Sequence, residues 1–291
     1  MAAITALEAQ ATGFNWVFSP CVAIPYNEKW GRVYEAFSES TELTTKLTIA
    51  SVSGYQGKIS GAPLVMATAK HFIGDGSTDF GVEGGNSSLS RDEVISRLLP
   101  PYRVAIAEGV GAIMTSFNTL EGLSMHAHKE LITDILKGTL QFNGLVVSDW
   151  KGYSRFGGDD IILAGVDMVM AVDGDLAMFQ DELEAAVLVD SDTTIADNDA
   201  VRRILRQKFR LGLFDNPFPT KELIKKIGCT RTSSILPEQA VRESLVLLKN
   251  ENKTLPLKKR CEDCSSRRIW RQLRFAVGRV DDQLARNKRK L

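Results

Sequence analysis

The stretch Gly144-Leu-Val-Val-Ser-Asp-Trp150 decides the fold predicted for this chain. Small and apolar residues run into Ser148, Asp149 and Trp150, a pattern typical of a buried parallel strand that ends in a carboxylate and an indole. Barrels and open α/β sheets carry their chemistry at that end of their strands. An Asp in this place is also common as a cap of the following helix or turn, so the stretch alone leaves both roles open. The neighbouring Trp favours a sugar site, because an indole stacks on the apolar face of a sugar ring.

The composition is that of a globular protein, with 44% hydrophobic and 25% charged residues in a chain of 291. Net charge is zero, but residues 258–291 hold twelve Lys or Arg against four Asp or Glu, which leaves residues 1–257 at about −8. We expect such an acidic body not to bind nucleic acid. No apolar run reaches the length of a membrane span, and the first residues lack the basic start and apolar core of a secretion signal. A lone CxxC motif, Cys261 to Cys264, is weak evidence for zinc or redox chemistry.

Apolar runs alternate with amphipathic segments along most of the chain, which predicts a parallel α/β architecture. The predicted strands cover residues 15–24, 63–72, 111–118, 144–149 and 164–171. The predicted helices cover residues 38–53, 90–108, 129–142, 180–189, 199–208 and 237–249. Ser90-Arg-Asp-Glu93 has the pattern of a capping box at the start of the second helix. A Gly-rich loop over residues 74–85 lacks the phosphate-binding pattern, and Gly and Pro stops over residues 211–219 predict a domain boundary.

Polar side chains follow the predicted strands. They are Arg32, Lys70 with His71, Ser116 to Asn118, Asp149 with Trp150, and Asp167. Parallel strands direct their C-terminal ends to one face, so we expect these groups to converge although they lie far apart in the sequence. Arg, Lys, His and Asp around one cavity, with aromatic residues on its rim, suit a pyranose, which needs donors and acceptors for its hydroxyls and a surface for its ring.

Seven blocks of the sequence resemble, in order, those of glycoside hydrolase family 3, the β-glucosidase and exo-glucanase type. They are WGRVYEAFSES (30–40), KHFIGDGST (70–78), the stretch from Met114 to His126, GLVVSDW (144–150), AGVDMVM (164–170), AVRRILRQKFRLGLFDNPF (200–218) and AVRESLVLLKNENKTLPL (240–257). The resemblance implies a TIM-like barrel, incomplete at its N-terminus, followed by the start of an α/β sandwich. The predicted domains are a barrel over residues 1–219, a linker over 220–236, the sandwich start over 237–257 and a non-matching basic tail over 258–291.

The resemblance also implies site residues. Asp149 matches the nucleophile of a retaining mechanism, which attacks the anomeric carbon to form a glycosyl-enzyme ester. Lys70 and His71 match a pair that hydrogen-bonds ring hydroxyls, Arg32 matches an Arg that orients the sugar, and Trp150 an aromatic of the leaving-group subsite. Met114 is grouped with the substrate-binding residues, although core packing explains this Met most simply. Lys70 and Arg32 nearby are expected to keep Asp149 ionised. No metal or organic cofactor is called for.

The sequence departs from the family pattern in several places. Retention needs a second carboxyl group that protonates the leaving oxygen, and the stretch that resembles the family ends before such an acid is reached. Single-domain relatives carry a His in the loop after KHF, where this chain has Asp75. Phe117 and Leu120-Glu121 replace a usual Tyr and Trp-Asn, and the loop after Trp150 is short. Strands expected before residue 15 are missing, so we expect a fragment of a β-glucosidase whose tail is a gene-model artefact.

Two other functions stay open at this point. A catalytically inactive fragment would at most bind glycans through Lys70, His71 and Trp150. A metal- or Schiff-base-dependent barrel enzyme would use His126 and His128, or Lys70, although two His without a carboxylate partner more often just pack. The sequence determines neither linkage preference, nor oligomeric state, nor compartment; the family it resembles is largely secreted or periplasmic.

Overall fold

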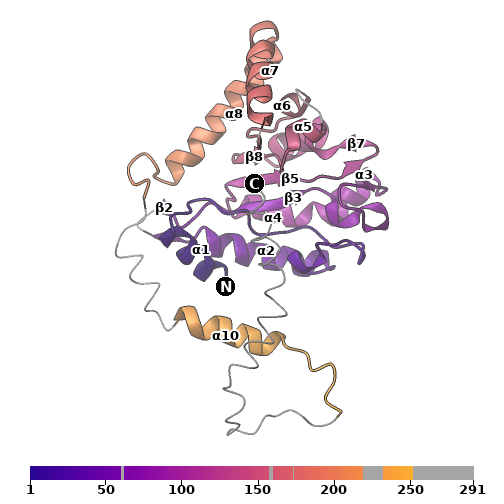
Figure 1. Ribbon diagram of the computed structural model, residues 1–291, viewed down its shortest axis with the longest axis vertical. Helices are drawn as coiled ribbons and strands as arrows, with labels where there is room; N and C mark the ends of the chain where they lie inside the picture. Colours follow the sequence, from indigo (N-terminus) through magenta and orange to yellow (C-terminus); the bar gives the residue numbers. More distant parts are fainter. Residues whose placement is uncertain (60–61, 157–159, 173, 219–231, 252–291) are drawn as a thin grey trace, which may run out of the picture. The chain divides into compact units, whose positions relative to one another are not determined.

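A parallel sheet of three strands lies among the helices of the unit Met1–Pro237 (Figure 1). The computed structural model describes residues 1–59, 62–156, 160–172, 174–218 and 232–251. The strands β3 (Thr68–Phe72), β5 (Ala112–Thr115) and β8 (Leu145–Val147) lie side by side in chain order. Ala112 pairs with Leu145 and Met114 with Val147 across β5 and β8. This sheet confirms the parallel α/β prediction, and barrel closure stays a prediction.

The segments expected as the first and fifth strands are not regular strands. Residues 15–24 form two isolated bridges, one from Trp16 to Met66 before β3 and one from Cys21 to Lys70 in β3. Pro20, between them, has no N–H to give to a ladder. Residues 164–171 meet β8 in a single bridge between Met168 and Val147. The Asp167 carboxylate takes the Val146 N–H at 2.6 Å, where a regular ladder would place a backbone carbonyl. Both segments therefore run parallel to their neighbours, as predicted, but neither forms the regular strand that was predicted.

Helices connect these strands and cover the sheet. The longer ones are α1 (Ala2–Ala11), α2 (Thr41–Tyr55), α4 (Pro100–Ala107), η6 (Glu130–Thr139), α7 (Asp175–Val189) and α8 (Ser191–Arg210). The predicted capping box is confirmed at α3 (Arg91–Glu93), which continues through η4 (Val94–Leu98) into α4. The N-cap of α2 is Ser40, whose hydroxyl accepts from the Leu43 N–H. No helix of the described residues is long and apolar enough to cross a membrane.

Short elements fill the loops that follow the strands. After β3 come η2 (Asp75–Ser77), η3 (Asp79–Gly81) and β4 (Asn86–Ser87). After β5 come β6 (Thr119–Leu120), β7 (Leu123–Ser124) and η5 (Met125–Ala127). After β8 come α5 (Gly152–Phe156) and α6 (Asp160–Leu163), while η1 (Val33–Glu35) and a hairpin of β1 (Lys58–Ile59) with β2 (Ala62–Pro63) precede β3. The loops after β3 and β5 are tied together, since β4 pairs with β6.

Successive residues of the sheet face two apolar clusters. The larger cluster lies under the helices and includes Ile113 and Val146, which are fully buried. The smaller cluster takes the alternate residues Met114, Leu145 and Val147. A parallel sheet with both faces covered is built from continuous apolar strands, as the sequence GLVV indicated.

The chain divides into two units, Met1–Pro237 and Glu238–Leu291. Helix α10 (Thr232–Ser244) begins inside the range predicted as a linker, earlier than the start predicted at Pro237. Pro is a common first residue of a helix, so the sequence pattern placed the boundary one turn late. Residues 220–231 of the linker, 252–257 of the sandwich start and the tail 258–291 lie outside the described residues, and the domain boundaries stay predictions.

Candidate active site

The ends of β3 and β8 bring His71 and Asp149 together. His71 Nε2 lies 3.7 Å from Asp149 Oδ2, and the two residues are 2% and 8% exposed. Asp149 Oδ1 accepts a hydrogen bond from the Trp150 N–H at 2.6 Å. Asp149 Oδ2 is buried and has no hydrogen-bond partner among the described residues. A buried carboxylate oxygen without a donor is costly, which is typical of a functional site rather than of a structural cap.

Arg32, in the segment before β3, contacts His71. Its Nη2 lies 2.9 Å from His71 Nε2, and its Nε and Nη2 bind both oxygens of Glu35 at 2.8 and 3.1 Å. Its Nη1 lies 3.3 Å from Glu83. Burial alone would lower the pKa of Arg32, but Glu35 and Glu83 raise it overall. The Arg32 hydrogen bond in turn holds the pKa of Glu35 below its usual value.

Lys70 lies next to this cluster and contacts Glu35 rather than Asp149. Its Nζ forms an ion pair with Glu35 at 3.5 Å, and its side chain is 17% exposed. The sequence predicted that Lys70 and Arg32 act on Asp149. In the structure the contacts of Arg32 reach Asp149 through His71, and Lys70 reaches the cluster through Glu35.

Asp75 is a member of the site that the sequence did not predict. Its Oδ2 lies 2.8 Å from His71 Nδ1, at hydrogen-bond distance although outside hydrogen-bond angles, and it is 4% exposed. Arg32 can only donate, so His71 Nε2 accepts and the ring proton belongs on Nδ1, toward Asp75. The residue at which this sequence departs from the expected His therefore contacts His71.

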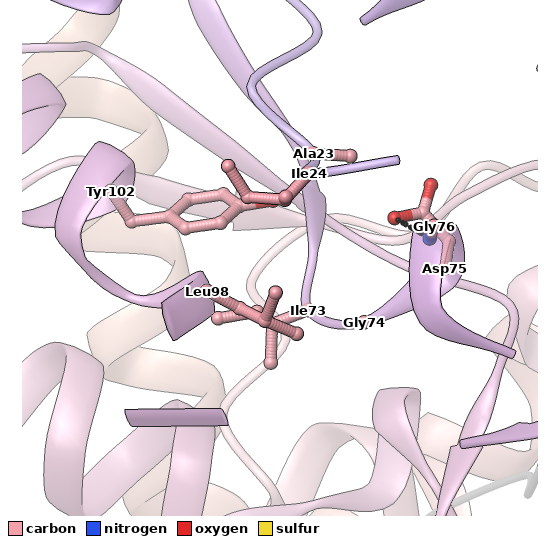
Figure 2. Close-up of a pocket in the computed structure, with 8 residues that line it drawn as sticks. All are labelled: Ala23, Ile24, Ile73, Gly74, Asp75, Gly76, Leu98 and Tyr102. Atoms are coloured by element: carbon pink, nitrogen blue, oxygen red, sulfur yellow. Dashed lines mark hydrogen bonds between the residues drawn. The ribbon is translucent and has the colours of Figure 1, made fainter. Parts of the chain in front are cut away.

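A small pocket lies beside the turn η2, which contains Asp75. It is lined by Ala23, Ile24, Ile73, Gly74, Asp75, Gly76, Leu98 and Tyr102. Figure 2 shows the Tyr102 ring and the Asp75 carboxyl group at opposite sides of it. The Tyr102 hydroxyl donates to the His71 carbonyl, which fixes the backbone at the end of β3. The lining is otherwise apolar or glycine, so the pocket supports the turn and does not suit a ligand rich in hydroxyls.

The remaining predicted residues have different surroundings. Trp150 is 54% exposed beside Asp149, so its indole is open to contact from solvent. Met114 is 2% exposed and lies in the smaller apolar cluster of the sheet. The Ser116 hydroxyl donates to Asn118 Oδ1. The expected convergence of Asp167 is wrong, because its carboxylate binds Lys137 at 2.6 Å and the Val146 N–H, away from the strand ends.

His126 contacts the backbone of Asp149. Its Nε2 accepts the Asp149 N–H at 3.0 Å, and burial lowers the pKa of His126 to about 4. Burial also lowers the pKa of His128, whose Nδ1 lies 3.5 Å from the Leu131 N–H. Within the described ranges, no group of three His, Cys, Asp or Glu is arranged to hold a metal ion. The two cysteines of the CxxC motif lie outside those ranges.

Comparison with known proteins decides the family. Residues 1–207 match the model described as the Glycosyl hydrolase family 3 N terminal domain. The chain belongs to glycosyl hydrolase family 3. The resemblance stated from the sequence blocks is thereby confirmed. The N-terminal domain of family 3 is of the TIM-barrel type, to which a row of parallel strands in chain order conforms.

Named members of family 3 align with most of this chain. It is 31% identical to a lysosomal beta glucosidase of Dictyostelium discoideum and 31% identical to a beta-xylosidase of Formosa agariphila, with 88% of the chain covered in each case. The crystal structure of an exo-1,3/1,4-beta-glucanase from a Pseudoalteromonas species superposes with a TM-score of 0.80 at 36% identity, over 88% of this chain. The chain spans about a third of these proteins, namely 33%, 38% and 34% of their lengths.

Proposed function

We propose that this chain carries the sugar-binding and nucleophilic half of a retaining β-glycosidase that removes terminal, non-reducing β-D-glucosyl residues. The observation that carries the proposal is the buried Asp149 Oδ2, which lacks a hydrogen-bond partner among the described residues and faces His71 at 3.7 Å. Such a buried oxygen is available to attack a carbon atom, whereas the second oxygen of a capping carboxylate ordinarily lies in solvent.

In this proposal the reaction proceeds through a covalent ester. Asp149 attacks the anomeric carbon, the bond from that carbon to the leaving oxygen breaks, and the leaving oxygen takes a proton from an acid. Water then attacks the same carbon and releases the sugar and the carboxylate. We assign the acid to none of the described residues.

The neighbouring side chains bind the sugar. Arg32, Lys70 and His71 supply donors and one acceptor to the ring hydroxyls, and Trp150 offers its exposed face to the group beyond the scissile bond. The Glu35 carboxylate spaces the two cations by binding each of them. A charged, hydrogen-bonded frame of this kind is already in place before the sugar arrives, which favours catalysis.

A second candidate substrate is a β-xyloside. A beta-xylosidase is among the relatives with 31% identity, and a xylosyl unit differs from a glucosyl unit by the absence of the hydroxymethyl group. The nucleophile and the roles given to Arg32 and His71 would be the same for both sugars.

Mechanism-based labelling tests the proposal without the missing acid. A 2-deoxy-2-fluoro-β-glucoside with a dinitrophenolate leaving group needs no protonation, so a nucleophile alone can trap it. Mass spectrometry should show one fluoroglucosyl group on the peptide that contains Asp149, and the corresponding xyloside tests the second substrate. Asp149→Asn should abolish the label, and Asp160→Asn, at an exposed Asp of α6, should keep it. No added mass with either sugar would leave glycan binding as the function.

A further inference from the structure

The ring of His126 stands between the ends of β5 and β8. We propose that His126 is a positioning residue, whose neutral imidazole bridges the backbones of Ser116 and Asp149 and so fixes the nucleophile at the strand end. The inference rests on the proposed function of Asp149 and goes beyond it, because it assigns a role to a residue that the sequence treated as packing or as a metal ligand.

The register of the sheet shows why a bridge is needed. The last paired residues of β5 and β8 are Met114 and Val147. Continued in step, the pairing would bring Ser116 opposite Asp149. The Asp149 N–H instead donates to His126 Nε2 at 3.0 Å. The imidazole therefore takes the place of a ladder hydrogen bond where the two strands separate.

The second side of the bridge is the Ser116 backbone. The Ser116 backbone acts to raise the pKa of His126, as a group that faces a ring N–H does, although His126 Nδ1 lies outside the geometry of a regular hydrogen bond. The Ser116 N–H is already bound to the Phe72 carbonyl at 2.8 Å, so the carbonyl of Ser116 is the group that remains. Because Nε2 accepts from Asp149, the donor is Nδ1–H. The ring is then neutral with its proton on Nδ1.

Close packing holds the ring in this orientation. Phe117 stacks on it at 6.1 Å between centroids with 27° between planes. A Cβ atom at Gly152 would lie 2.8 Å from two atoms of the ring, Cδ2 and Nε2, so glycine is required there by space. The backbone N–H of His126 donates to the Ser124 hydroxyl oxygen at 3.2 Å. The ring is fully buried and has little freedom to turn.

The consequence falls on the direction of the nucleophile. The Asp149 backbone is held by His126 at its N–H and by the Gly152 N–H at its carbonyl, at 3.0 Å each. With both sides fixed, the side chain is directed toward His71 and the sugar site. A shift of the strand end by a fraction of an ångström would move Oδ2 away from the line of attack.

The bridge is tested first on the unchanged chain by nuclear magnetic resonance. A hydrogen bond from N–H to a ring nitrogen transmits a scalar coupling between the two nitrogens. We expect this coupling between the Asp149 amide and His126 Nε2, together with ring shifts of the Nδ1–H tautomer at neutral pH. Absence of the coupling, or the opposite tautomer, would overturn the proposal, and neither result depends on activity.

Variants test the consequence for the nucleophile, with the fluoroglucoside described above as probe. His126→Leu removes the acceptor and should slow the maximal labelling rate roughly 10- to 100-fold, because a misplaced reacting atom lowers the rate by that much. The fluoroglucoside concentration that gives half the maximal rate should change little. His126→Gln keeps an acceptor oxygen near the position of Nε2 and should restore most of the rate. His128→Gln, at a neighbouring His outside the bridge, should leave the rate unchanged.

The outcomes separate this inference from the proposed function. Equal rates for His126→Leu and the unchanged chain, or a folded His126→Gln as slow as His126→Leu, would overturn the role of His126 alone. An unchanged chain that shows the nitrogen coupling but takes no label would overturn the proposed function and, with it, this role. If the variants do not fold, the coupling in the unchanged chain decides whether the bridge exists.

Discussion

At the scale of single residues, Asp75 lies beside one nitrogen of His71 and leaves the other toward Arg32 and the proposed sugar site. Its Oδ2 lies 2.8 Å from Nδ1, and both residues are buried. Asp75→Asn keeps the shape but presents an amide, which allows the ring proton to move to Nε2, where it would face Arg32. Outer partners of this kind typically change function by about 10- to 100-fold.

We expect Asp75→Asn to slow labelling at Asp149 and to weaken glucose binding, measured by calorimetry, within that range. The control is Asp79→Asn, because Asp79 lies in the same loop but binds Ser88 and Asn86 at the surface. Equal effects of the two changes would show that the loop is sensitive to any lost carboxylate and that His71 is not involved.

His126 predicts a pH dependence of stability. Its pKa falls from an ordinary 6.5 to about 4 in the folded chain, chiefly through burial. A folded state that disfavours protonation is most stable above the ordinary pKa and loses that contribution as the pH falls from about 6.5 toward 4. At about pH 4.5 the loss should be about 2 to 3 kcal/mol.

Urea unfolding at neutral and acid pH measures this effect. In the His126→Gln variant the side chain at position 126 does not titrate. The stability that this variant loses between the two pH values should therefore be smaller by about 2 to 3 kcal/mol. Comparing the two proteins removes the contribution of the carboxylates, which titrate in both. Identical pH profiles would mean that His126 is already charged, or exposed, in the folded chain.

The scale of elements shows what sequence patterns predict and where they stop. Periodicity located β3, β5, β8 and the helices between them, and the order of strands placed His71 and Asp149 at one edge. It did not predict that Pro20 and Asp167 interrupt the outer pairings, because these depend on single hydrogen bonds. The contacts of Asp75 with His71 and of His126 with Asp149 were missed for the same reason.

The direction of a loop side chain is fixed by neighbours that are distant in sequence. Asp75 faces His71 because Gly74 turns the chain with a φ of 109° and Gly76 packs against Ile24. His126 reaches Asp149 through stacking on Phe117 and the space left at Gly152. A signal was present in Gly74 and Gly76, which flank Asp75, and in Gly152, which follows Asp149 by three residues, but glycine alone does not say which neighbour approaches.

The turn η2 offers a test at this scale. A Cβ atom at Gly76 would overlap the Ile24 carbonyl oxygen, which belongs to backbone and cannot rotate away. We expect Gly76→Ala to destabilise the chain by about 1 to 3 kcal/mol, as overpacking does. Gly174→Ala is the matched control, because nothing lies within 4 Å of its Cβ position. Unfolding midpoints in urea measure both; equal midpoints would mean that the turn relaxes without cost.

At the scale of the whole molecule, the site and the core belong to the first unit. The four buried apolar clusters of the described residues all lie between Ala6 and Leu211. The site residues Arg32, His71 and Asp149 lie in the same unit. The family match also ends within this unit, at residue 207.

Helix α8 closes that unit. Its Arg203 donates to the backbone carbonyls of Phe142 and Gly144 at 2.6 and 2.9 Å, directly before β8. Its Nε lies 2.7 Å from Asp199. The strand that delivers Asp149 is therefore fastened at its start by α8, and its end is held by His126.

Two shortened chains test this organisation. A chain that ends at Pro237 retains the clusters, α8 and the site, so we expect it to unfold cooperatively and to be labelled at Asp149 at the rate of the full chain. A chain that ends at Asp190 loses α8 and exposes the apolar face beneath it, and we expect it to lose both properties. Circular dichroism during urea unfolding and the labelling rate give the two readouts. A slower label in the chain ending at Pro237 would show that residues 238–291 contribute to the position of Asp149, since the contacts of α8 before β8 and the contact of Asp149 with His126 are intact.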